Sequence, residues 1–420
     1  MAALHRRIAW GIVASLVASA CETDAAEPAE VVIAAIYPLS GDQAATGTDL
    51  RRGVELAAEI VNGAYDLEVP LAAEGGLPGL GGARIRVVFA DHASDPAQAV
   101  VAAERLIAAE EAVAFLGAYE SAVTEAVSTV VEAAGIPFVA AESTAPSLTE
   151  RGFRWFFRTT ADDRIFVENF FDFLAELREE GIEPASAAIV YEDGIFGSSV
   201  AALEADAASG AGLPVVAEVG YPAAAAAFAA VAETVRDSGA AIVFQTSFEQ
   251  DAIGILQAYE GLGYRPEAIL GMDAGFISPA FVETLGDDAN DLLSREVWAK
   301  DLAEAKPLVG EVDALFRQRY GADMTGNSAR AFTGLIVLAE AIDRAGSTDP
   351  ERIREALLAT ELGADELIVP WDGVRFDPAT GQNVLAKGII VQIQARAYRT
   401  VWPRELATVD LVWPMRPWAQ

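Results

Sequence analysis

Polar residues follow two apolar runs of the sequence at points where strands are expected to end. In the stretch FLGAYESAVTEAV, residues 115–127, the apolar run halts at Gly117 and a helical pattern opens at Ser121. A second apolar run, residues 137–141, leads directly into three polar residues. These are Glu142, Ser143 and Thr144. Because parallel strands present their carboxyl ends at one edge of a sheet, we expect these residues to gather there.

Later strand ends carry aromatic side chains and one carboxylate. These residues are Phe196, Phe248 and Asp273. The start of a helix has unpaired N–H groups and a partial positive charge, which suit a ligand carboxylate. An Asp beside a cleft suits an ammonium group, and aromatic walls exclude water from a ligand. Together these residues predict a clamp for a small zwitterion.

Each candidate also has an ordinary structural interpretation. Ser121 fits the role of a helix N-cap, and Thr144, just before Ala145 and Pro146, fits a residue that shapes a turn. Asp273 fits a solvated loop acid. The two phenylalanines fit ordinary core positions. Capping and ligand binding are compatible at Ser121, so both interpretations stay open there.

Catalytic and metal-binding chemistry find little support in the sequence. Apart from His5 in the first residues, His92 is the only histidine, which argues against a Ser-His-Asp triad or a His-rich zinc site. We expect His92 to be a loop residue ahead of a helix cap. No nucleophile–base pair can be named, so we expect no enzymatic activity, no metal site and no cofactor. The net charge of −34 disfavours binding to nucleic acids.

Short apolar strands alternate with longer amphipathic helices from residue 31 onward, and the pattern restarts near residue 186. The expected strands are residues 31–36, 84–90, 112–117, 137–141, 186–191, 213–220, 241–246 and 268–272. Apolar strands that alternate with helices indicate parallel sheets covered on both faces. The sequence therefore predicts an α/β fold with two doubly wound, parallel-sheet lobes.

The first residues have the pattern of a secretory leader. Residues 1–21 combine a basic start, a short apolar run and small residues before Cys21, the single cysteine. Cleavage after Ala20 suits simple secretion, whereas a small-small-Cys ending suits a bacterial lipoprotein that is acylated on Cys21. We favour the lipoprotein, with residues 22–30 as a disordered linker.

A series of motifs resembles the type I periplasmic binding proteins, in the branch that binds leucine, isoleucine, valine and related amides for ABC transporters. In order, the motifs are IYPLSGDQAATGTDLRRGVELA, DHASDPAQAVVAAERLI, FLGAYESAVTEAV, IPFVAAESTAPSLTERGFRWFFRTTADD, AAIVYEDGIFGSSV and AILGMDAGF. They fall within residues 31–345. The resemblance implies two lobes joined by a hinge of three crossovers. We expect residues 31–158 and 276–364 in the N-terminal lobe, and residues 159–275 and 365–420 in the C-terminal lobe.

The same resemblance implies roles for the residues at the strand ends. Ser121 and Thr144 would hold a ligand carboxylate, and Ser143, in the same loop, is a further candidate. The carbonyl of Glu142 and the side chain of Asp273 would hold the ammonium group. Asp273 is shorter than the Glu that is common in the family.

The remaining candidates would line the pocket for the ligand's side chain. Phe196 and Phe248 fall where relatives often have tyrosines, and Phe cannot donate the hydrogen bond of a Tyr hydroxyl. Tyr119 would line the pocket, and Thr46 falls at a position that is often aromatic in relatives. These departures leave open a ligand other than leucine or isoleucine.

The resemblance implies a solute-binding protein of an ABC importer that closes by a hinge on an amino acid or similar small polar ligand. The implied partners are that ligand and the permease subunits, with the protein itself a monomer. We expect it in the periplasm or at the cell surface, with a lipid anchor on Cys21. A ligand-sensing receptor module of the same fold, without a part in transport, is the alternative.

Overall fold

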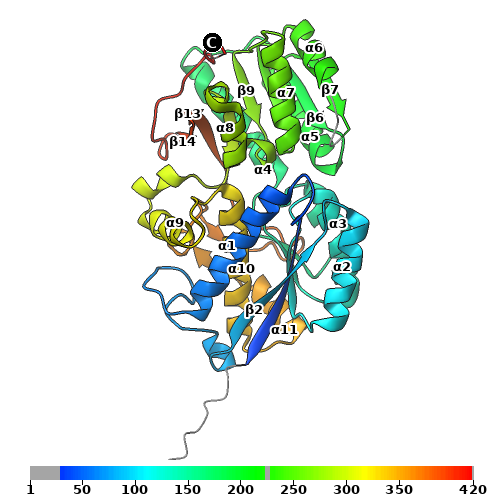
Figure 1. Cartoon of the computed structure of the whole chain (residues 1–420), viewed down its shortest axis with the longest axis vertical. Coiled ribbons are helices and arrows are strands. Elements are labelled where there is room, and N and C mark those ends of the chain that lie inside the picture. The colour runs from blue at the N-terminus through cyan, green and yellow to red at the C-terminus, as the bar shows by residue number, and fades with distance from the viewer. Residues whose placement is uncertain (1–28, 223–227, 419–420) are drawn as a thin grey trace, which may run out of the picture.

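The computed structural model describes residues 29–222 and 228–418, which form two lobes stacked along the long axis (Figure 1). The expected leader with Cys21, and most of the expected linker, lie outside the described residues. Each lobe is a sheet with helices on both faces, so the predicted α/β fold with two lobes is confirmed.

The first lobe is built on five parallel strands in the order β2-β1-β3-β4-β5. The strands are β1 (Glu30–Tyr37), β2 (Arg84–Asp91), β3 (Ala114–Gly117), β4 (Phe138–Ala140) and β5 (Phe156–Arg158). One face packs against α2 (Pro96–Ala109) and α3 (Ser121–Ala134), and the other against α1 (Ala44–Asn62) and α10 (Gly326–Ala345). Helix α11 (Pro350–Leu358) packs beside α10. Burial on both faces explains why these strands are apolar throughout.

The second lobe is built on seven strands in the order β14-β13-β10-β9-β8-β6-β7. Its parallel strands are β6 (Ala187–Glu192), β7 (Val215–Tyr221), β8 (Ile242–Thr246), β9 (Ala268–Gly271) and β10 (Leu293–Glu296), and its antiparallel strands are β13 (Ile389–Gln394) and β14 (Ala397–Trp402). The helices around it are α4 (Asp163–Glu179), α5 (Ile195–Ala211), α6 (Ala229–Ser238), α7 (Glu249–Gly261) and α8 (Pro279–Leu285). Two elements stand apart: α9 (Pro307–Tyr320) and the small sheet of β11 (Leu362–Gly363) and β12 (Gly373–Val374).

The chain passes between the two sheets three times, as the resemblance implied. The crossing segments are residues 159–162 after β5, residues 297–299 after β10 and residues 384–388 before β13. Asn383, the residue just before the third crossing, donates from Nδ2 to the carbonyl of Thr159 at 2.9 Å. The first and third crossings therefore lie side by side.

Two segments lie in a different lobe from the one expected. Helix α8 packs against α7, and strand β10 pairs with β9 and β13, so residues 279–296 belong to the second lobe, although the sequence grouped them with the N-terminal lobe. Residues 376–383 were expected in the C-terminal lobe, but Phe376 packs edge-on against Phe157 of β5. Strand β10 was not recognised from the sequence because it holds three polar residues and lacks the apolar run that marks a buried strand. The rest of the expected division stays a prediction.

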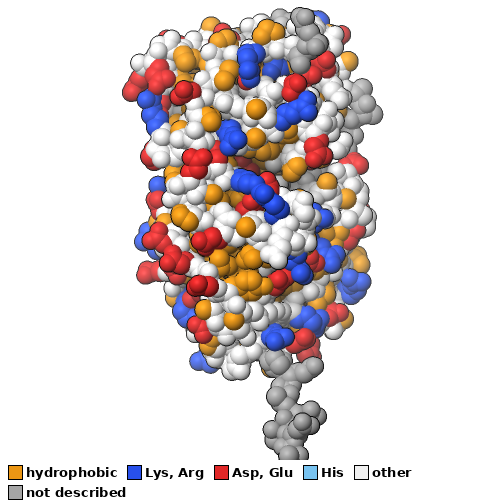
Figure 2. All heavy atoms as spheres, turned by 60° about the vertical axis from the view of Figure 1, so that its left-hand side comes forward, with side chains coloured by type: hydrophobic (Ala, Val, Ile, Leu, Met, Phe, Trp, Pro, Cys, Tyr) orange, Lys and Arg blue, Asp and Glu red, His pale blue; other side chains and the backbone are white. Residues whose placement is uncertain are grey.

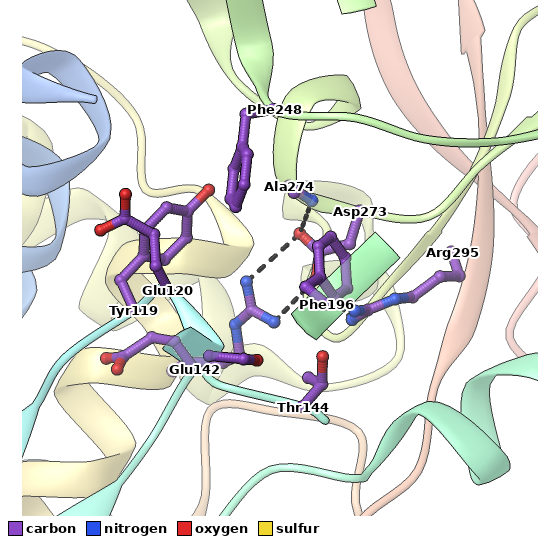
Figure 3. A pocket seen from close by; sticks show the side chains of 11 residues that line it. Tyr119, Glu120, Glu142, Thr144, Phe196, Phe248, Asp273, Ala274 and Arg295 are labelled. Carbon is purple, nitrogen blue, oxygen red and sulfur yellow. Dashed lines mark hydrogen bonds and ion pairs between the residues drawn. The ribbon is translucent and has the colours of Figure 1, made fainter. Parts of the chain in front are cut away.

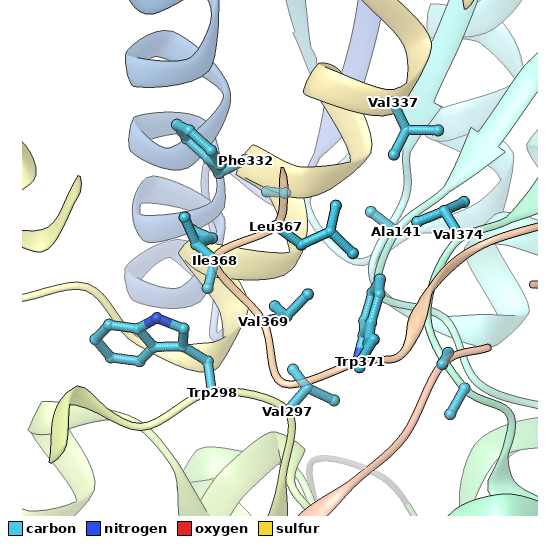
Figure 4. Packing of buried hydrophobic residues seen from close by; sticks show 14 of the residues in the cluster. Ala141, Val297, Trp298, Phe332, Val337, Leu367, Ile368, Val369, Trp371 and Val374 are labelled. Carbon is cyan, nitrogen blue, oxygen red and sulfur yellow. The ribbon is translucent and has the colours of Figure 1, made fainter. Parts of the chain in front are cut away.

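The crossings pack around an apolar cluster (Figure 4). Trp371, Val369 and Ile368 extend from the segment before β12 toward α10 and toward the second crossing at Val297 and Trp298. Trp371 is 1% exposed. Burying aromatic and branched side chains at this point fixes the paths of the chain between the lobes.

Helices α1 and α10 approach each other closely at Gly53. A Cβ atom at this position would lie 2.2 Å from the carbonyl oxygen of Ser328 on α10. Since no real Cβ tolerates that distance to backbone, only glycine fits unless one helix shifts. This contact sets the position of the first turns of α10, which reach the interlobe region.

The surface carries charges of both signs. In Figure 2 acidic and basic side chains lie close together over the face shown, with apolar side chains between them. Within residues 29–222 and 228–418, no helix combines the length and the apolar character that crossing a membrane requires.

Candidate ligand-binding site

A small cavity lies between the two lobes, at the carboxyl ends of strands from both sheets (Figure 3). Its lining residues are Tyr119, Glu120, Ser121, Glu142, Thr144, Phe196, Phe248, Asp273, Ala274, Arg295 and Arg330. Seven of the nine residues selected from the sequence are among them. The cavity measures about 20 Å³, which is room for about one water molecule. A larger molecule therefore enters only if the walls separate or side chains move.

The first wall of the cavity comes from the loops after β3 and β4. Gly117 ends β3 with a φ of +134°, and a Cβ there would lie 2.3 Å from the carbonyl oxygen of Ile36 on β1. Glycine is therefore required where the chain leaves the sheet. Tyr119 follows with a φ of +77°, a strained conformation of the kind that clusters at binding sites. This short, tight loop brings the start of α3 to the cavity.

Ser121 is the first residue of α3, and its hydroxyl does not cap the helix. The N-cap is Glu120, which makes no side-chain capping hydrogen bond, and the Ser121 Oγ accepts from the amide of Ala145 at 3.4 Å. The N-cap interpretation of Ser121 is therefore wrong. The first amides of a helix have no acceptor within it, so this wall can donate hydrogen bonds to an anion.

Ser143 and Thr144 have different places in the β4 loop. Ser143 does not line the cavity; its hydroxyl donates to the carbonyl of Tyr119 at 2.8 Å and lies 2.5 Å from Thr124 Oγ1. It therefore ties the β4 loop to the β3 loop. Thr144 does line the cavity, and its carbonyl accepts from the amide of Asp163 at 3.0 Å.

Aromatic rings close the cavity from the second lobe. Phe248, just before α7, lies across the cavity from Glu142 and Thr144 (Figure 3). Its ring centroid is 5.9 Å from that of Phe196 and 6.2 Å from that of Tyr119. The three rings line one continuous apolar surface, so the interpretation of the phenylalanines as ordinary core residues covers only part of their role.

Asp273 lies opposite the first wall, and its carboxylate is bonded by groups of the protein; its expected role as the partner of a ligand ammonium stays a prediction. Its Oδ2 accepts from Arg295 Nη1 at 2.5 Å and from Arg330 Nη1 at 2.7 Å. Its Oδ1 accepts from the amide of Ala274 at 2.5 Å and from Arg330 Nη2 at 3.2 Å. Dashed lines in Figure 3 mark bonds of Asp273. At 1% exposed, it is not a solvated loop acid either.

The second wall consists of Asp273, Arg295 and Arg330. Its two arginines were not predicted from the sequence. Arg295 comes from β10, and its guanidinium carbon lies 3.6 Å from the ring centroid of Phe166. Arg330 comes from the second turn of α10 and donates from Nη2 to Asn327 Oδ1 at 2.6 Å. Both are almost fully buried. An arginine at the start of a long apolar helix, as at Arg330, was the one available signal, because a buried guanidinium needs an anionic partner.

Burial raises the pKa of three carboxyl groups in or behind the cavity to values near neutral pH. Burial raises the pKa of Glu142 to about 7, although its Oε1 accepts from the Tyr37 hydroxyl at 3.0 Å. Burial likewise raises the pKa of Glu120 to about 7. Behind the cavity, burial and the charge of Asp273 raise the pKa of Glu296 to about 8. Glu142 is among the residues that line the cavity, and the expected role of its carbonyl stays a prediction.

His92 is a buried member of the structure rather than a loop residue alone. Its Nδ1 accepts from the amide of Ser94 at 3.1 Å, so Nε2 carries the proton and donates to the carbonyl of Ala118 at 3.1 Å. Burial lowers the pKa of His92 to about 4. The neutral ring thus holds the β3 loop in place next to Tyr119.

Thr46 does not reach the cavity. It lies in the first turn of α1, where it is buried, and it is not among the lining residues. The arginines of the second wall, rather than α1, complete the lining. Among the described residues no group of three or more metal-binding side chains comes together.

Comparison with known proteins gives one consistent family. A family model described as periplasmic binding protein matches residues 30–397. The Leu/Ile/Val-binding protein homolog 8 of Brucella abortus is 30% identical over 390 residues, which cover 91% of this chain and 93% of that protein. The Leu/Ile/Val-binding protein homolog 7 of Brucella suis is 28% identical over an alignment that covers 96% of this chain and 98% of that protein.

Solved structures share the fold at lower identity. A leucine binding protein from Thermotoga maritima is 20% identical with a TM-score of 0.75, covering 88% of this chain and 97% of its own. The substrate binding protein of a branched-chain amino acid transporter from Streptococcus pneumoniae, solved with isoleucine, is also 20% identical with a TM-score of 0.75. It covers 89% of this chain and 100% of its own.

Proposed function

The chain belongs to the periplasmic binding protein family, in its leucine-, isoleucine- and valine-binding branch, and we propose that it is the solute-binding protein of an ABC importer. In this proposal it captures a small polar ligand, an amino acid or an analogue, between its lobes. The relatives named above support the solute-binding role. The family consists of substrate-binding proteins rather than enzymes.

One observation carries the proposal: both lobes contribute residues to a single cavity at the carboxyl ends of their strands. Ser121 on one wall and Asp273 on the other share this cavity, as the predicted site requires. Because it holds only about one water molecule, a ligand must enter when the lobes are apart and be enclosed when they close. Hinge closure across the three crossings would provide this movement.

We further propose that the protein works outside the cytoplasm as a monomer, anchored through an acylated Cys21. The family implies the extracytoplasmic location, whereas the anchor rests on the sequence of residues 1–21. Its partners in this proposal are the permease subunits of the importer. A sensing module of the same fold remains the alternative; co-purification with permease subunits from host membranes would favour transport, and their absence would favour sensing.

A ligand screen tests the proposed function. The protein, stripped of co-purified ligand by partial unfolding and dialysis, is heated with neutral and acidic amino acids, amides, urea and deaminated acids. A ligand present at 100 times its Kd stabilises the native state by about 2.7 kcal/mol, which raises the melting temperature. If no small molecule raises it, and none co-purifies with the protein, the proposed function is wrong.

A further inference from the structure

Asp273 has no acceptor capacity left for a ligand. A carboxylate offers about four lone-pair sites, and four donors already occupy them, two on each oxygen. Three of the four come from guanidinium groups. A ligand ammonium placed here would have to displace an arginine and would lie beside two positive charges.

Arg330, in contrast, has donors to spare. A guanidinium carries five N–H groups, and the hydrogen bonds of Arg330 use three of them, two on Asp273 and one on Asn327. Its Nε is buried with no partner, and the side chain lines the cavity. A buried donor without an acceptor is unfavourable, so a role in holding the lobes together does not by itself account for this arginine.

The balance of charge in the cavity also favours an anion. Arg295 and Arg330 face one fully engaged carboxylate. The other lining acids, Glu120 and Glu142, have pKa values raised to about 7 by burial, so each carries only part of its negative charge near neutral pH. The N-terminus of α3 adds a partial positive charge from the first wall.

We propose that the site selects small acids of net negative charge over amino acids of zero net charge; this proposal rests on the proposed function. A carboxylate of the ligand bonds to the free N–H groups of Arg330. A zwitterion without a second acid group satisfies the first wall but leaves its ammonium facing the guanidinium groups.

Two matched pairs of compounds test this selectivity on the unaltered protein by calorimetry. The pairs are leucine with 4-methylpentanoate, which lacks only the amino group, and glutamine with glutamate, which differ by one charge. A charged hydrogen bond in a buried site corresponds to a change in Kd of about tenfold or more. We expect the more negative member of at least one pair to bind more tightly by that factor.

The possible results distinguish a failure of the proposed selectivity from a failure of the proposed solute-binding function. If leucine or glutamine binds as tightly as its acidic counterpart in both pairs, the selectivity is wrong while solute binding stands. If none of the four compounds binds, the selectivity is overturned as well. If the wider ligand screen also finds no small molecule that binds, the proposed function is wrong as well.

Two variants test whether Arg330 is responsible for the preference for the acid. Arg330→Gln removes the charge and the fork of donors, and we expect the preference for the acid to fall to near unity. Arg105→Gln, on the exposed surface of α2, is the control and should keep the full preference. If Arg330→Gln folds and still prefers the acid, the role of Arg330 is refuted. If it does not fold, the matched pairs on the unaltered protein decide alone.

Discussion

The two walls of the interlobe cavity are built in different ways. The first wall uses the start of α3 and the loop after β4, so its donors are local in sequence and close to backbone. The second wall brings together Asp273, Arg295 and Arg330, from three separate elements, into a buried ion cluster. The first wall can recognise a carboxylate with little dependence on side-chain charge, whereas the second depends on a balance of buried charges.

The largest effect is expected from removing the central charge of the second wall. Asp273→Asn keeps an oxygen for the amide of Ala274 but leaves Arg295 and Arg330 without their anion. Breaking a buried ion pair typically costs about 3–5 kcal/mol. We expect the free energy of unfolding, measured with urea, to fall by that amount.

A control variant makes this test specific to burial. Asp237 on α6 pairs with Arg236, but its side chain is 68% exposed, so Asp237→Asn should change stability by less than about 1 kcal/mol. Equal effects of the two variants would contradict the idea that the second wall depends on buried charge.

A second prediction concerns Glu142 and pH. The unfolded chain has an ordinary Glu pKa, whereas native Glu142 has a pKa of about 7, so the native state binds more protons between these values. Stability therefore falls as the pH rises through this window. Glu142→Gln removes this loss, and its stability relative to the parent protein should improve by about 2–3 kcal/mol between pH 5 and pH 8.

This difference is read from urea denaturation of both proteins at each pH. His92, with a pKa lowered to about 4, destabilises the native state as the pH falls below its unfolded pKa. It is present in both proteins, so its contribution cancels. A difference that stays constant with pH would show that Glu142 is ionised in the native state throughout.

A third prediction concerns how α10 presents Arg330. Gly53→Ala places a Cβ against the carbonyl of Ser328, two residues before Arg330. The overpacking should destabilise the protein by about 1–3 kcal/mol and weaken ligand binding by shifting α10. Gly210 in α5 has no atom within 4 Å of an added Cβ, so Gly210→Ala should be neutral or slightly stabilising.

The smallest effect is expected at the first wall. Ser121→Ala removes one hydroxyl and leaves the helix amides in place, so ligand affinity should fall by about fivefold, or about 1 kcal/mol. Calorimetry against Ser209→Ala, on the exposed surface of α5, measures this change. If both variants bind the ligand with equal affinity, the Ser121 hydroxyl does not contribute to ligand binding.

The first wall and most strands were predictable from the sequence because their signals are local. The apolar run before Gly117 and the helical pattern after Ser121 mark a strand, a turn and a helix without reference to the rest of the chain. The same logic found the loop after β4 and the aromatic residues of the second lobe.

The second wall was not predictable because its signals are tertiary. In β10, the residues Ser294, Arg295 and Glu296 are all buried, yet their composition resembles an exposed loop. Asp273 was selected from the sequence without its arginine partners, because nothing in its own segment indicates a contact with Arg330, 57 residues away. Thr46 was selected by position in the family alone, and α1 does not bring it to the cavity.

A crystal structure of the protein with its bound ligand would show directly which groups of the two walls hold the ligand. We predict a ligand between the two lobes, with hydrogen bonds from the start of α3 at one end and from Arg330 at the other, and with Asp273 still bonded to both arginines. A ligand bound elsewhere, or one whose ammonium group takes the place of Arg330 on Asp273, would contradict it.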